Sequence, residues 1–107
     1  MMSAGEPDPN AAGADAPGTI TRIVKIVNSK GLHARPSAKF VQLVEKYDAR
    51  LTVSYNGETV NGDSLMGLVT FAAGPGSQLT LKASGPQAKD VLDAIAAFVA
   101  SKFGEED

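Results

Sequence analysis

One short stretch of the chain holds the side chains best suited to chemistry. It contains His33, the only histidine among the 107 residues, followed by Ala34, Arg35 and Pro36. An uncharged imidazole has a lone pair that can attack phosphorus. An arginine offers a forked hydrogen-bond donor that suits phosphate oxygens. These two residue types, two positions apart, therefore favour phosphoryl chemistry.

A helix is expected to begin directly after the histidine. Large apolar residues recur at helical spacing over residues 34–47, namely Phe40, Val41, Leu43, Val44 and Tyr47. The N-terminus of a helix exposes backbone N–H groups and carries a partial positive charge, so phosphate binds well there. Ala34 and Arg35 have N–H groups to offer, whereas Pro36 has none. The pattern thus predicts that His33 receives a phosphoryl group, which the backbone and Arg35 stabilise.

Other uses of the same stretch remain open or are disfavoured. A single histidine near a helix start is often only a polar residue at the cap, and Arg35 can be an ordinary surface charge. A metal site is disfavoured because the chain has no cysteine and no carboxylates cluster near His33 in the sequence. A serine hydrolase is disfavoured because there is no nucleophile-elbow motif and nothing orients His33 as a base. No cofactor and no metal are expected.

Length and charge narrow the class of protein. A chain of this size is enough for one small domain, and hydrophobic residues make up 43% of it. From residue 20 onward there are ten basic and nine acidic residues, a balance that argues against a nucleic-acid binder. No apolar run approaches the ~20 residues of a membrane span, and the N-terminus lacks the features of a secretory signal. We expect a cytoplasmic protein that does not insert into a membrane.

The first eighteen residues differ in composition from the rest. Residues 1–18 are rich in Ala, Gly, Pro and Asp and have no large apolar residue after Met2. Such a segment buries too little surface to offset the entropy lost on ordering. The sequence therefore predicts a disordered extension at residues 1–18 and one domain at residues 19–107.

Strand and helix patterns alternate along the domain. Residues 20–28 are dense in β-branched residues, which is typical of a strand. Residues 51–60 alternate and contain Asn56-Gly57, which predicts a hairpin with a type I′ turn. Ser64 or Asp63 is predicted to cap a short helix that carries Leu65, Met66 and Leu68. Residues 77–84 alternate again, with one apolar face made of Leu79, Leu81 and Ala83.

The last helix is expected to open at Gly85-Pro86 and to end at Gly104. Its buried stripe comprises Ala88, Val91, Leu92, Ile95, Phe98, Val99 and Phe103. The aromatic residues are expected to be core: Phe40, Tyr47, Tyr55, Phe71, Phe98 and Phe103. The element order is strand, helix, strand, strand, short helix, strand, helix. It predicts an α+β open-faced sandwich, in which three helices cover one face of a four-stranded antiparallel sheet.

Two motifs carry a resemblance to a known family. The stretch "GLHARPSAKFVQL" (residues 31–43) together with "GDSLMGL" (residues 62–68) resembles HPr, the histidine-containing phosphocarriers of the bacterial phosphoenolpyruvate:sugar phosphotransferase system. The resemblance covers residues 21–102, and the expected order of strands and helices is also that of the family. It implies a stoichiometric carrier rather than an enzyme.

The resemblance implies roles for individual residues. His33 would be the residue that enzyme I phosphorylates on Nδ1, and this chain would then hand the group to an enzyme IIA. Arg35 would assist the phosphoryl group, and Ser64 would match the serine that an HPr kinase/phosphorylase modifies in some bacteria. Leu65, Met66 and Leu68 would belong to an apolar patch that docks partners. For each there is a plainer alternative: Ser64 can be only an N-cap, and a helix this short buries at least one of its apolar residues.

The resemblance also leaves the pathway open. It implies a monomer, but residues 1–18 are no part of the usual family pattern. Many enteric members carry basic residues on the outer face of the first helix, where this chain has Gln42 and Glu45, although Lys39 and Lys46 compensate in part. A nitrogen-type regulatory carrier is therefore one alternative. Another is an interaction module for a transcription regulator, in which Ser64 phosphorylation controls binding.

Overall fold

The computed structural model describes residues 18–105, so most of the predicted N-terminal extension and the last two residues lie outside it. Within these residues the elements follow the predicted order. They are β2 (Ile20–Lys25), α2 (Ala34–Val44), β3 (Arg50–Tyr55), β4 (Glu58–Asn61), α3 (Leu65–Thr70), β5 (Gln78–Ser84), α4 (Ala88–Ala100) and the short 3₁₀ helix η1 (Lys102–Gly104).

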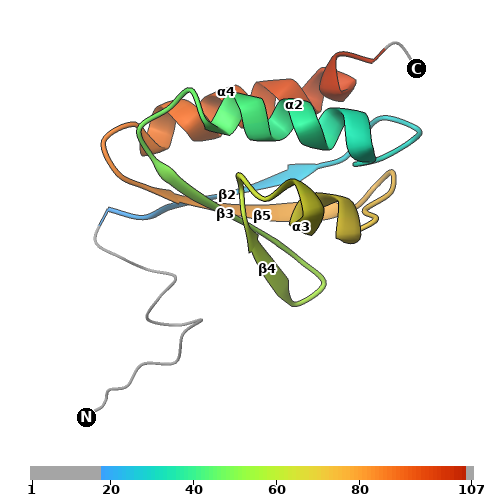
Figure 1. The fold of residues 1–107 in the computed structure, drawn as a ribbon, viewed down its shortest axis with the longest axis horizontal. Coiled ribbons are helices and arrows are strands. Elements are labelled where there is room, and N and C mark those ends of the chain that lie inside the picture. Colours follow the sequence, from blue (N-terminus) through green and yellow to red (C-terminus); the bar gives the residue numbers. More distant parts are fainter. Residues whose placement is uncertain (1–17, 106–107) are drawn as a thin grey trace.

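The four strands form one antiparallel sheet in the order β2-β5-β3-β4. Helices α2, α3 and α4 all lie on the same side of it (Figure 1). This arrangement confirms the predicted open-faced sandwich. The reason is the alternation of the strands: in β5, Leu79, Leu81 and Ala83 are buried under the helices, while Thr80 and Lys82 between them are not.

The core lies between the sheet and the helices and contains most of the predicted apolar stripes. Phe40, Phe71 and Phe103 are buried, whereas Tyr47, Tyr55 and Phe98 pack at its margin and are only partly buried. The β3–β4 hairpin turns at Asn56 and Gly57, whose φ angles are 52° and 82°. Two positive φ angles in a two-residue loop are the mark of a type I′ turn, as the dipeptide predicted.

Three predicted elements end earlier in the structure than expected. The last helix was expected from Gly85-Pro86 to Gly104, but α4 spans only Ala88–Ala100, because the backbone turns left-handed at Lys102 and Phe103 and forms the separate η1. The first strand was expected over residues 20–28 but ends at Lys25, and the chain then leaves the regular ladder through a turn at the fully buried Asn28. Helix α2 was expected to reach Tyr47 but ends at Val44, where backbone amides begin to bond three residues back instead of four.

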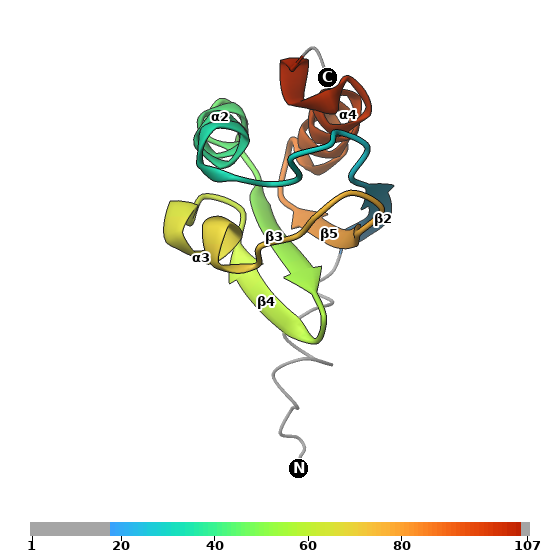
Figure 2. The ribbon, with the colours of Figure 1, turned by 90° about the vertical axis from the view of Figure 1, so that its right-hand side faces the viewer.

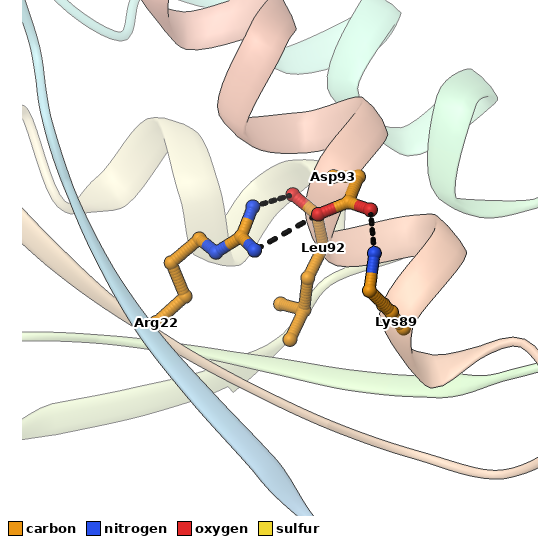
Figure 3. A network of polar contacts seen from close by, with 4 residues as sticks. All are labelled: Arg22, Lys89, Leu92 and Asp93. Carbon is orange, nitrogen blue, oxygen red and sulfur yellow. Dashed lines mark hydrogen bonds and ion pairs between the residues drawn. The ribbon is translucent and has the colours of Figure 1, made fainter.

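Helix α4 is tied to the edge strand β2 by polar contacts (Figure 3). The Arg22 guanidinium contacts the carboxylate of Asp93 at 2.8 Å and donates to the carbonyl oxygen of Leu92 at 3.3 Å. Lys89 reaches the other oxygen of the same carboxylate at 2.7 Å. Hydrogen bonds from Lys89 and Arg22 lower the pKa of Asp93. These contacts link α4 to β2 at the surface, where ion pairs contribute little to stability.

The relative direction of α2 and α4 sets up the functional end of the molecule. The two helices pack against each other and run antiparallel, so the start of α2 lies beside the end of α4 (Figures 1 and 2). Figure 2 looks onto that end, where the loop that joins β2 to α2 crosses below the end of α4. Residues from the first third of the domain and from its last turn therefore meet there.

Candidate functional site

The loop before α2 is fixed by a close approach of two backbones. Gly31 has a φ of +68°, and a Cβ at that position would lie 2.3 Å from the carbonyl oxygen of Ala73. That same oxygen accepts a hydrogen bond of 2.8 Å from the amide of Leu32, whose side chain is buried. Only glycine fits such a position, because it combines left-handed backbone with no room for a side chain. The residue that follows this loop is His33.

His33 is the N-cap of α2, with extended backbone angles (φ −89°, ψ −169°). Its carbonyl oxygen accepts from the Ser37 amide at 3.0 Å, but its side chain makes no capping hydrogen bond. Within residues 18–105, the amides of Ala34 and Arg35 have no hydrogen-bond partner. Pro36 has no N–H at the third helical position, so it offers a capping side chain nothing to bind. The helix start thus keeps two open donors beside a side chain that is 36% exposed.

An unusual turn brings an acidic side chain to this histidine. After α4 the chain passes through Lys102, Phe103 and Gly104, whose φ angles are 61°, 57° and 75°. Left-handed backbone at a non-glycine residue costs of order 1 to 3 kcal/mol and persists only where the surroundings enforce it. Phe103 supplies that anchor: it is 1% exposed, and its ring meets that of Phe98 edge-on, with 5.2 Å between centroids. The reversal points the next residue, Glu105, back toward α2.

Glu105 and Asn28 complete the site. One carboxylate oxygen of Glu105 lies 2.8 Å from His33 Nε2, and the other accepts from Asn28 Nδ2 at 2.9 Å. The same amide nitrogen also donates to the carbonyl oxygen of Gly31 at 3.0 Å. Burial raises the pKa of Glu105, but the hydrogen bonds from Asn28 and His33 and the proximity of His33 and Lys30 outweigh it and lower the pKa. The carboxyl group is therefore ionised at neutral pH and can only accept hydrogen bonds.

The Glu105 carboxylate determines which nitrogen of the His33 ring carries the hydrogen. An ionised carboxylate cannot donate, so the hydrogen of the His33–Glu105 contact belongs to Nε2. In the uncharged ring the lone pair is then on Nδ1. The arrangement presents one nucleophilic nitrogen, two backbone N–H groups and an exposed Arg35 on the first turn of α2.

The second predicted motif forms a separate helix start. Ser64 is the N-cap of α3, and its hydroxyl oxygen accepts from the Gly67 amide at 3.1 Å. Leu65 and Met66 are 42% and 73% exposed. Leu68, in contrast, is fully buried in the core. Its assignment to a docking patch is therefore wrong, because a side chain without exposed surface cannot contact a partner.

Two residues of the site were not foreseen from the sequence. Asn28 is a fully buried polar residue after an apolar strand, and Glu105 lies 72 residues from His33 along the chain. The only signal in the sequence was an acidic residue, Glu105, directly after Gly104, where the last helix was predicted to end. Among residues 18–105 no group of three or more potential ligands could hold a metal ion, and no helix there is long and apolar enough to cross a bilayer.

Comparisons with known proteins agree with this geometry. Residues 20–101 match the family model described as "PTS HPr component phosphorylation site". The phosphocarrier protein HPr of Cupriavidus necator is 42% identical over 86 residues, which cover 80% of this chain and 97% of that protein.

Solved structures of the same kind superpose on the fold. HPr-C-His from Thermoanaerobacter tengcongensis gives a TM-score of 0.78 at 34% identity and covers 82% of this chain and 99% of its own. An HPr from Bacillus anthracis gives 0.73 at 37% identity, with 76% and 96% covered. Because the family model spans most of the chain, and this fold carries its lone histidine at the start of α2, the protein belongs to the HPr family of phosphotransferase-system phosphocarriers.

Proposed function

We propose that His33 accepts a phosphoryl group on Nδ1 from phosphorylated enzyme I and passes it to an enzyme IIA. The observation that carries the proposal is a partly exposed N-cap imidazole beside the amides of Ala34 and Arg35, which have no hydrogen-bond partner among the described residues. Such amides suit phosphate oxygens, and an arginine guanidinium on the same turn adds charge. The chain would act as a stoichiometric carrier in the cytoplasm and not as an enzyme.

A phosphotransfer assay tests the histidine directly. Phosphoenolpyruvate and enzyme I should label the wild-type chain with acid-labile, base-stable phosphate, while His33→Ala should take up none. Ser64→Ala should be labelled like the wild type and serves as the matched control. Labelling of His33→Ala at an undiminished level would refute the assignment.

The surface beside the site suits transient partners. Leu65 and Met66 are exposed apolar residues on α3, which packs against α2. A small exposed apolar centre surrounded by polar groups is typical of weak, reversible protein interfaces. We propose that Leu65 and Met66 contact enzyme I and enzyme IIA, with the chain acting as a monomer. Met66→Ser should then raise the KM for transfer while leaving single-turnover chemistry in a preformed complex unchanged.

We further propose that Ser64 is a site of regulatory phosphorylation by an HPr kinase/phosphorylase. The hydroxyl is partly exposed and lies at a helix N-terminus, where an added phosphate would face backbone N–H groups and a favourable dipole. Incubation with ATP and such a kinase should label the wild type and His33→Ala but not Ser64→Ala. Absence of label on the wild type, with a known HPr labelled in the same assay, would leave Ser64 as a structural cap only.

A further inference from the structure

Glu105 is held in place from two sides before it reaches His33. On one side, the left-handed turn and the buried Phe103 fix the backbone that leads to it. On the other, Asn28 donates to its Oε1 from a fully buried position. Glu105 itself is only 18% exposed. A surface glutamate in a chance contact with a histidine would have neither of these two restraints.

The orientation of the Asn28 amide is fixed by its neighbours. Its Nδ2 faces two acceptors, the carbonyl oxygen of Gly31 and the carboxylate of Glu105. A flipped amide would set its oxygen against both, which is repulsive. Asn28 therefore joins the loop that carries His33 to the carboxylate that contacts it, and the three side chains form one unit.

We propose that Glu105, oriented by Asn28, is a positioning residue for phosphoryl transfer: it keeps the proton on Nε2 and offsets the positive charge that the ring acquires when Nδ1 takes up phosphorus. The inference deepens the proposed function and rests on it. Carboxylates commonly play this part where a histidine presents one chosen nitrogen, by accepting from the opposite N–H.

The electron and proton balance of the step shows why the carboxylate matters. The lone pair of Nδ1 forms a bond to phosphorus as the bond from phosphorus to the donor atom of phospho-enzyme I breaks, and that electron pair stays on the donor atom. Because Nε2 retains its hydrogen, the phosphorylated ring of His33 is cationic, and the adjacent carboxylate of Glu105 neutralises it. When the group moves on, the pair returns to Nδ1. No proton has to enter or leave in either direction.

The test compares Glu105→Gln and Glu105→Ala with the wild type in full-length chains. The single-turnover rate of phosphorylation by phospho-enzyme I should fall roughly 10- to 100-fold in both variants, the range typical of a lost histidine-orienting group. Glu58→Gln removes the same charge from an exposed position on β4 and should leave the rate unchanged. Glu105→Asp, which keeps the carboxylate, should recover part of the rate.

Nitrogen NMR of the His33 ring gives a readout that a purely structural role would not move. In the wild type the uncharged ring should be almost wholly in the Nε2–H form, and in Glu105→Ala it should become a mixture of both tautomers. Wild-type rate and tautomer in Glu105→Ala, in a chain that is labelled on His33, would overturn this inference alone. Failure of the wild type itself to be labelled on His33 would instead overturn the proposed function.

Discussion

Helices α2 and α3 begin in opposite ways. At α3 the cap residue Ser64 uses its hydroxyl to satisfy the amide of Gly67, the third helical residue. At α2 the cap residue His33 turns its ring away toward Glu105, and the third helical residue is Pro36, which has no amide to satisfy. One helix start is closed by its own side chain. The other is left open: in the part of the chain that the structure describes, nothing accepts from the Ala34 and Arg35 amides, so they can bind an incoming anion.

The missing side-chain cap on α2 lowers the stability of that helix and leaves its N-terminal amides available for chemistry. A capping side chain stabilises a helix by about 1 kcal/mol, and α2 forgoes that contribution. The proline at the third position fixes the backbone for the first turn without requiring a cap, so an imidazole can occupy the cap position and remain available. The loop before α2 compensates through tight packing of Gly31 on Ala73.

The largest expected effect concerns that packing. Gly31→Ala should lower the free energy of unfolding by about 3 kcal/mol or more, because the new Cβ would overlap the Ala73 carbonyl and strain a left-handed backbone. Gly57→Ala is the matched control: it has a similar φ of +82° but nothing within 4 Å, so only about 1 kcal/mol of backbone strain is expected. Urea unfolding of both variants measures the difference, and equal losses would mean that the loop before α2 yields easily.

The next effect tests the closed helix start. Ser64→Ala should lower the free energy of unfolding by about 1 kcal/mol, since the Gly67 amide loses its acceptor. Ser64→Asp, which can still accept, should retain most of that stability. A Ser64→Ala variant as stable as the wild type would show that the cap contributes little and would weaken the contrast between the two helices.

A smaller effect of opposite sign is expected at the open start. His33→Ser should raise the free energy of unfolding by about 0.5 kcal/mol, because a hydroxyl there can accept from the Arg35 amide. The gain should stay below a full cap, since Pro36 offers no second donor. Thermal unfolding and phosphotransfer should be measured on the same preparation: a more stable chain that takes up no phosphate is expected. Loss of stability would mean that the His33–Glu105 contact outweighs a new cap.

The smallest effect is a shift in acid sensitivity. The pKa of Glu105 is lower in the folded chain than in the unfolded one, so the unfolded chain binds more protons in acid and stability falls as pH falls. This contribution is fully present above the ordinary glutamate value of about 4.3 and is lost as the pH passes down through the folded pKa. Glu105→Gln should flatten the dependence of unfolding free energy on pH between about pH 5 and pH 3. An unchanged slope would mean that Asp93, whose pKa is also lowered in the folded chain, carries the acid response instead.

The architecture was accessible from the sequence because its signals are local. Alternation in β5, the Asn56-Gly57 turn and the apolar stripe of α4 each specify one element, and the layer order follows from their apolar faces. Element ends were less accessible: β2 stops at Lys25 although Ile26 and Val27 continue its β-branched run in the sequence.

The candidate site likewise contains a residue that local sequence predicts and one that only the packing of distant segments reveals. The position of His33 at a helix start could be read from its neighbours, whereas Glu105 could not, because the contact depends on how α2 and α4 pair and on the left-handed turn after α4. The prediction that Leu68 belongs to a docking patch was wrong for a related reason. A six-residue helix has too few turns for its pattern to tell the buried face from the exposed one.

The left-handed turn at Lys102 and Phe103 makes the contact to the imidazole depend on a short segment that follows the last helix. A chain in which that turn has not formed can keep its sheet and its three α-helices while the histidine stands without its carboxylate. A protease cut after Gly104 would likewise leave a folded domain with an untethered imidazole. Circular dichroism would miss such a change, whereas phosphotransfer kinetics would detect it.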